Sequence, residues 1–258
     1  MALSRSWRAP AALATLLAAA PLRAQDQPPP PPPPPLPFAF AQPTTVSLGF
    51  DLGFLSTGGN SDVTTLNFAE NLGLKTGHWM FGQTAGTIYG STAGVTSADQ
   101  YKAGLRADYH FSARMAAYGL GSFERNRFAG IAQNFEEASG LGYLVAAEPA
   151  DTLVFETGIS FNQQRGTGGE RSDFAAGRAA AAYKHLVTQS AFARQALEIL
   201  PDLADGANLR VNSQTDLVAP LSKKVAIKSS YAVRFDHQPE PGFKRTDRVF
   251  TTGVQIVF

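Results

Sequence analysis

Apolar and polar residues alternate along most of the chain after residue 43. In residues 101–111, Tyr101 and Leu105 share one face of an extended chain, whereas Lys102 and Arg106 share the other. A period of two residues is that of a β-strand whose two faces meet different environments. The same alternation recurs in residues 46–55, 152–161, 208–217 and 225–236. The body of the chain is therefore predicted to consist of long strands, each with one apolar face.

Twelve such strands can be delimited by turn signals. They cover residues 43–56, 62–76, 79–92, 99–111, 115–127, 133–147, 152–164, 171–186, 190–200, 207–219, 223–236 and 245–258. The connections after the even-numbered strands are short, and most of those after the odd-numbered strands are longer and richer in Gly, Asn and Asp. An even number of strands with short turns at one end and longer loops at the other is typical of an outer-membrane barrel.

Strand length separates a membrane barrel from a soluble β-sandwich. Most of the predicted strands have 11–16 residues. About 9–11 residues suffice to cross a bilayer, whereas strands of soluble proteins more often have about 5–6. Both ends of the strand-rich region fall at the short-turn end, so the sheet can close without an exposed edge. Residues 43–258 are therefore predicted to form an all-β, antiparallel up-and-down transmembrane β-barrel of about 12 strands, located in the bacterial outer membrane with periplasmic termini.

Three places depart from clean alternation. Glu70 shares a face with Leu66 and Leu72, so it faces lipid unless a local bulge turns it inward or the register is different there. Gln83 is a similar irregularity, and residues 118–128 fit the alternation in either phase.

The first forty residues have another character. Arg5 and Arg8 precede an apolar run over residues 9–22, and a small residue, Ala24, ends it. This layout predicts a secretory signal peptide over residues 1–24. A membrane anchor fits less well, because the run is short and interrupted by prolines.

A proline-rich segment follows the predicted signal peptide. Residues 28–35 are eight consecutive prolines, which cannot join a helix or a sheet ladder and favour a stiff polyproline II rod. Residues 25–42 are therefore predicted to be a periplasmic linker. It could be a simple tether, a spacer toward the cell wall or a ligand for a proline-binding partner.

Composition narrows the function classes. The net charge is +1, with 17% charged residues and no cysteine. So balanced a charge does not suggest a nucleic-acid partner, and the lack of cysteine rules out disulfides and thiolate metal sites. No cofactor is implied by the sequence.

If the apolar faces contact lipid, the polar faces line the interior of the barrel. The candidate lumen-lining residues are Lys102, Arg106, Asp108, Glu156, Arg178, Arg210, Asp216, Lys228, Arg234 and Asp236, together with Asp51, Lys75, Lys184, Arg194 and Glu198. Buried charges need partners, so many of these should pair across strands. Two alternatives stay open: a narrow passage for small solutes or ions with a mild anion preference, and a self-neutralising ionic core that conducts nothing.

Catalytic signatures are weak. No Gly-x-Ser-x-Gly elbow, paired-histidine metal spacing or Gly-rich phosphate loop occurs. Residues 58–62, with the sequence GGNSD, lack the wider ligand spacing of a calcium loop. No catalytic or metal-binding residue is assigned. The alternative is a barrel enzyme that acts on lipid or lipopolysaccharide and assembles histidine, serine and aspartate from different strands, with His110 and His185 as the residues to test.

Several stretches resemble the salt-induced outer-membrane proteins, a bacterial family of mostly uncharacterised function. They are GNSDVTTLNF (59–68), KTGHW (75–79), residues 101–130, GLGY (140–143) and residues 230–247. The resemblance implies an outer-membrane β-barrel that is induced by salt in some bacteria, and it implies no catalytic residues. The proline run departs from the family pattern.

The last strand ends on Phe258 after apolar residues at positions 250, 254 and 256. A terminal aromatic residue after an alternating strand resembles the C-terminal signal of bacterial outer-membrane proteins. This resemblance implies recognition by the barrel-assembly machinery. Taken together, the sequence predicts a small porin-like channel or an envelope-structural protein that is surrounded by outer-membrane lipid.

Overall fold

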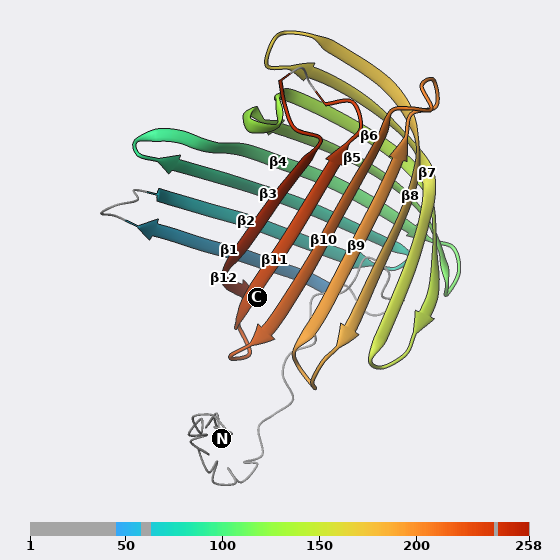
Figure 1. Cartoon of the computed structure of the whole chain (residues 1–258). Helices are drawn as coiled ribbons and strands as arrows, with labels where there is room; N and C mark the ends of the chain where they lie inside the picture. The colour runs from blue at the N-terminus through green and yellow to red at the C-terminus, as the bar shows by residue number, and fades with distance from the viewer. Residues whose placement is uncertain (1–44, 58–62, 240–241, 258) are drawn as a thin grey trace, which may run out of the picture. The chain divides into compact units, whose positions relative to one another are not determined.

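The computed structural model describes residues 45–57, 63–239 and 242–257. It contains the strands β1 (Thr45–Thr57), β2 (Val63–Thr76), β3 (Trp79–Thr92), β4 (Val95–His110), β5 (Met115–Asn126), β6 (Ile131–Ala147), β7 (Asp151–Gly166), β8 (Arg171–Leu186), β9 (Phe192–Pro201), β10 (Leu209–Pro220), β11 (Val225–Asp236) and β12 (Thr246–Val257), and one 3-10 turn, η1 (Arg127–Ala129). Successive strands pair antiparallel, and β1 pairs with β12 (Figure 1). The predicted twelve-stranded antiparallel barrel is confirmed. No described helix is long and apolar enough to span a membrane.

The strand boundaries agree with the predicted ones to within a few residues, and β4 differs most. This strand begins at Val95, so the predicted loop between β3 and β4 is wrong. The connection is the two-residue turn Ala93–Gly94, with φ angles of 51° and 75°. Positive φ at both central residues is the requirement of a type I′ hairpin turn, whose twist matches that of the flanking strands.

The outward face of the barrel is apolar. Phe54, Leu105 and Phe250 are 70%, 65% and 67% exposed. Exposed aromatic residues also occur toward both ends of single strands, such as Trp79 and Tyr89 in β3. An apolar band flanked by aromatic residues is the surface that a transmembrane barrel presents to lipid.

Glu70 lies on this outward face. Strand β2 pairs with β1 and β3 without a register shift, and Glu70 is opposite Phe50 on one side and Ala85 on the other. A bulge or a different register at this position is therefore wrong. Gln83 also faces outward, and its Nε2 donates a hydrogen bond of 3.4 Å to Glu70 Oε1. The two irregular residues are thus polar partners of each other, which lowers the cost of exposing either one to lipid.

Residues 118–128 adopt one of the two phases that the sequence allows. Tyr118 is 4% exposed inside the barrel, and Phe123 contacts Phe135 at a centroid distance of 5.0 Å. The alternation ends where the ladder between β5 and β6 shifts between Glu124 and Asn126. Asn126 then caps the 3-10 turn η1 through its side chain.

The interior also contains apolar clusters, which the polar inner faces of the predicted strands did not suggest. One cluster consists of Ala116, Leu144 and Val154, and a second consists of Phe192, Val218 and Ala226. All of these residues lie near the end of the barrel with the short turns. At this end the inner side chains pack as they do in a protein core.

Candidate functional site

Each of the ten candidate residues forms an ion pair. They lie on β4 (Lys102, Arg106, Asp108), β7 (Glu156), β8 (Arg178), β10 (Arg210, Asp216) and β11 (Lys228, Arg234, Asp236), and their partners include Asp51, Glu124, Arg194 and Glu198. Asp108 and Asp216 are each only 1% exposed. Buried carboxylates of this kind are retained only when they are paired and hydrogen-bonded.

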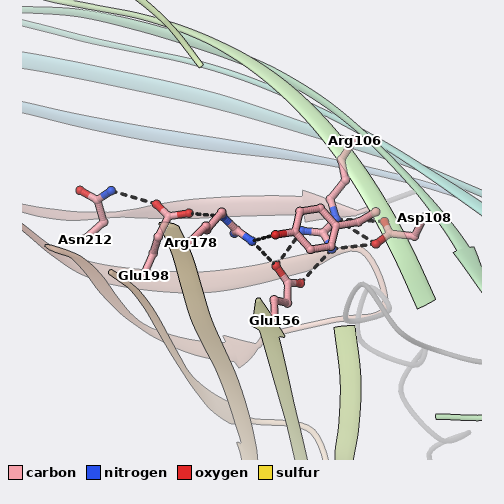
Figure 2. Close-up of polar contacts among 7 residues, drawn as sticks. Arg106, Asp108, Glu156, Arg178, Glu198 and Asn212 are labelled. Carbon is pink, nitrogen blue, oxygen red and sulfur yellow. Dashed lines mark hydrogen bonds and ion pairs between the residues drawn. The ribbon is translucent and has the colours of Figure 1, made fainter. Parts of the chain in front are cut away.

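Five of these charges form one continuous network, here called the ion-pair chain: Arg106, Asp108, Glu156, Arg178 and Glu198 (Figure 2). Arg106 Nη2 lies 2.7 Å from Asp108 Oδ1 and 2.8 Å from Glu156 Oε1. Arg178 lies 2.7 Å from Glu156 through Nη1 and 2.7 Å from Glu198 through Nε. The chain thus connects β4 with β7, β8 and β9 along the inside of the barrel, although Arg106 and Glu156 are 50 residues apart.

Asn212 extends the ion-pair chain to β10, because its Nδ2 donates a hydrogen bond of 2.9 Å to Glu198 Oε2. Glu156 accepts from both arginines and is therefore the central anion. Charge-assisted hydrogen bonds are short and directional, so the five side chains hold one another in fixed positions.

Tyr118 supports the ion-pair chain from β5. Its hydroxyl accepts a hydrogen bond of 2.8 Å from Arg178 Nη1. The guanidinium carbons of Arg106 and Arg178 lie 4.6 and 5.0 Å from the centroid of its ring, within the range of cation–π attraction.

Two glycines make room for Tyr118. Gly140 and Gly158 are opposite each other on β6 and β7, and a Cβ on either one would lie 2.8 or 2.7 Å from the Tyr118 hydroxyl oxygen. The same Cβ atoms would also collide with backbone oxygens of the paired strand, at 2.0 and 2.1 Å. The sequence interpretation missed Tyr118, and the signal that could have found it is this pair of inward glycines beside an ambiguous strand.

A second cluster surrounds Glu124, which the sequence interpretation also missed. Its Oε2 lies 2.7 Å from Arg234 Nη1, and its Oε1 lies 3.6 Å from Lys102 Nζ. Gln100 donates to the same carboxylate at 3.2 Å. The Arg234 side chain is 18% exposed, whereas the Lys102 side chain is 56% exposed. Lys102 is therefore the less firmly held cation of this cluster.

A cavity of about 620 Å³ lies inside the barrel and adjoins both clusters. Its charged lining residues are five basic ones (Lys102, Arg106, Arg178, Lys228, Arg234) and four acidic ones (Asp51, Glu156, Glu198, Asp247). The lining charge is therefore close to balanced, with one more positive group than negative groups. A volume in this range can hold a small molecule or several hydrated ions.

The two histidines of the enzyme alternative do not share a site. His110 is 7% exposed and lies inside the barrel, two residues after Asp108 on β4. His185 lies on the outer face, where its Nδ1 is 2.8 Å from Asp151 Oδ1. Within the described ranges, no group of three His, Asp or Glu residues has the arrangement needed to hold a metal ion.

Comparison with solved structures places the chain among porin-like barrels in fold. The NanC porin overlaps with a TM-score of 0.50 at 9% identity, covering 82% of this chain and 99% of that one. The translocator domain of the autotransporter NalP from Neisseria meningitidis has a TM-score of 0.45 at 13% identity, covering 83% of this chain and 87% of that one. At such identities the NanC likeness shows the barrel fold alone. No curated protein matches the sequence.

A family model also matches most of the chain. Residues 50–258, which include every charge of the ion-pair chain, match the model of a family described as a protein of unknown function, DUF481. The chain therefore belongs to the DUF481 family.

Proposed function

We propose that this protein is a small porin-like channel of the bacterial outer membrane and that the interior cavity is part of its solute path. The observation that carries the proposal is a charged cavity of about 620 Å³ inside a closed barrel whose outward face is apolar. A water-filled lumen and a lipid-facing wall are the two environments that such a barrel needs. Outer-membrane lipid and small solutes or ions are then its partners.

The arrangement of charges favours a mild preference for anions. The ion-pair chain neutralises most of its own charge, because each arginine lies against two carboxylates. Lys102 is the exposed cation in the cavity lining. Wall charges that are not fully compensated tune the selectivity of a pore, so Lys102 is the residue expected to attract anions.

The channel is tested in planar bilayers. We expect the purified protein to give conductance steps. In a KCl gradient, the sign of the reversal potential should show that Cl⁻ is more permeant than K⁺. Lys102→Glu should abolish or reverse this preference, because it replaces the exposed cation by an anion. Lys223→Glu, in the exposed turn before β11, is the matched control and should leave selectivity unchanged. An absence of steps at all voltages and salt concentrations contradicts the channel and favours a sealed ionic core.

The remaining parts of the proposal concern location and processing. Residues 1–24 serve as a signal peptide, residues 25–42 as a periplasmic linker and residues 43–258 as the barrel, with both termini in the periplasm. The resemblance to salt-induced outer-membrane proteins further suggests that the protein level rises with external salt, which immunoblotting of cells grown at low and high salt tests. A barrel enzyme is not proposed, because His110 and His185 lie on opposite faces of the wall.

Phe258 lies outside the described residues, and its role in assembly is part of this proposal. Deletion of Phe258 should lower the amount of folded protein in outer-membrane fractions, because the assembly machinery loses its signal. Folded protein is measured by heat-modifiable migration, in which the unheated barrel runs faster than the boiled one. Phe250→Ala removes an exposed aromatic residue from the same strand and is the control. Equal folded amounts in the two variants contradict the role of Phe258.

A further inference from the structure

The barrel closes through a short seam. Strand β1 pairs with β2 over its full length, and β12 pairs with β11 from Thr246 to Ile256. Between β1 and β12, the described residues pair only over Gly49–Leu52 and Val254–Val257. Figure 1 shows the two strands diverging from this paired end. Gly53 still lies close to Thr252 and Gly253, but the described residues 54–57 of β1 and 246–251 of β12 pair with a strand on one side only.

An ion pair marks the point where the paired part of the seam ends. Lys228 on β11 is opposite Gly253 on β12, and its Nζ forms an ion pair with Asp51 on β1. The lysine reaches across β12 because Gly253 has no side chain in the way. A Cβ at Gly253 would lie 2.0 Å from the Leu52 carbonyl oxygen, so β1 approaches β12 more closely here than another residue type would allow.

The interior cavity reaches this seam. Its lining includes Asp51 and Leu52 of β1, and Thr252 and Gly253 of β12. Asp247, Val249 and Thr251 on the unpaired edge of β12 also line the cavity, where water can satisfy backbone groups that lipid could not.

The surfaces on both sides of the seam include apolar residues beside polar ones such as Asn67 and Thr251. Inside the barrel, Ala69 and Ile88 on one side and Ala232 and Val249 on the other line the cavity. Their inward direction follows from their cross-strand partners, since Ala69 is opposite the inward Asp51 and Val249 is opposite Ala232. Outside the barrel, exposed Leu52, Phe54 and Phe250 flank the same seam. An apolar surface thus continues from the outer wall to part of the inner wall.

We propose that the unpaired part of the β1–β12 seam is a lateral opening, through which the acyl chain of a membrane amphiphile enters the cavity. The Lys228–Asp51 ion pair lies at the closed end of this opening, where the paired part of the seam begins. An acyl chain fits better than an added peptide strand, because the edges diverge and a strand pairing with one would leave the other unpaired. The proposal rests on the proposed membrane location and concerns a ligand that conductance alone does not detect.

The test places a fluorescent reporter inside the barrel. Trp79, exposed on the outer wall, is the one tryptophan outside residues 1–24. A Trp79→Phe, Ile88→Trp variant carries its reporter on the cavity lining instead. In vesicles of phosphatidylcholine with brominated acyl chains, we expect the reporter at position 88 to lose much of its fluorescence. Native Trp79 serves as the control for insertion into the bilayer.

A covalent bridge separates entry through the seam from quenching across the wall. The chain has no cysteine, so Phe54→Cys and Thr252→Cys can be added and joined by a bismaleimide. These positions would be opposite each other if the ladder of the seam continued. Bridging should restore the fluorescence at position 88, whereas Lys228→Met should increase quenching and Lys223→Met should not change it.

The outcomes distinguish this inference from the proposed channel. If Trp79 is quenched but the reporter at position 88 is not, or if bridging has no effect, the lateral opening is overturned, whatever the conductance. If quenching at position 88 depends on the bridge but no conductance is found, the lateral opening stands and the channel fails. Heat-modifiable migration establishes that each variant has folded.

Discussion

Replacing Glu156 with alanine should lower the free energy of unfolding by roughly 3 kcal/mol, because it removes one partner of a buried ion pair. Glu156 is the carboxylate that Arg106 and Arg178 share. Without it, two guanidinium groups would remain close to the same Tyr118 ring, with like charges facing each other. The loss is smaller than for an isolated pair, because Asp108 and Glu198 still neutralise one arginine each.

Urea unfolding of the barrel in detergent, followed by the fluorescence of Trp79, measures this effect. Glu148→Ala is the matched control, since Glu148 is exposed in the turn before β7. Glu156→Gln keeps the size of the side chain and should fall between the wild type and Glu156→Ala. Equal unfolding midpoints for Glu156→Ala and Glu148→Ala would show that the ion-pair chain contributes nothing to stability.

Replacing Gly253 with valine should prevent the barrel from closing. The new Cβ would lie 2.0 Å from the Leu52 carbonyl oxygen and 2.9 Å from the Gly53 Cα. Both are backbone atoms, which cannot move aside as the end of a flexible side chain can. The β1–β12 ladder is short, so few other hydrogen bonds could compensate for the separation of the strands. An open barrel would leave two unpaired edges in contact with lipid, which is strongly unfavourable.

Heat-modifiable migration after refolding reports this closure, and we expect the fast-migrating form to be lost in Gly253→Val. Gly119→Val is the control, because a Cβ at Gly119 would meet nothing within 4 Å. It introduces the same strand-favouring side chain at an open position. A Gly253→Val protein that folds as fully as Gly119→Val would refute the requirement for a glycine at the seam.

Local alternation was sufficient to predict the strands and their faces. The period of two places Lys102 and Arg106 on one face of β4 and Tyr101 and Leu105 on the other, and β4 in the barrel agrees. Even the anomalous Glu70 follows the predicted register. The information is local, because the direction of a side chain in a strand depends only on its position along that strand.

The β3–β4 connection was predicted wrongly for a physical reason. A long loop was expected where Ala93 and Gly94 form a two-residue turn. Type I′ turns favour Asn-Gly, Asp-Gly or Gly-Gly, and alanine at the first position is a weak signal for such a turn.

The sequence by itself determined the class of the fold and the number of strands. Only the tertiary structure decided that Arg106 pairs with Glu156, that Tyr118 lies over Gly140 and Gly158, and that β1 meets β12 along a short seam. These features depend on the stagger between strands far apart in the chain and on the closure of the barrel, which fix how the inner side chains of different strands are aligned. Alternation within one strand carries no information about that alignment.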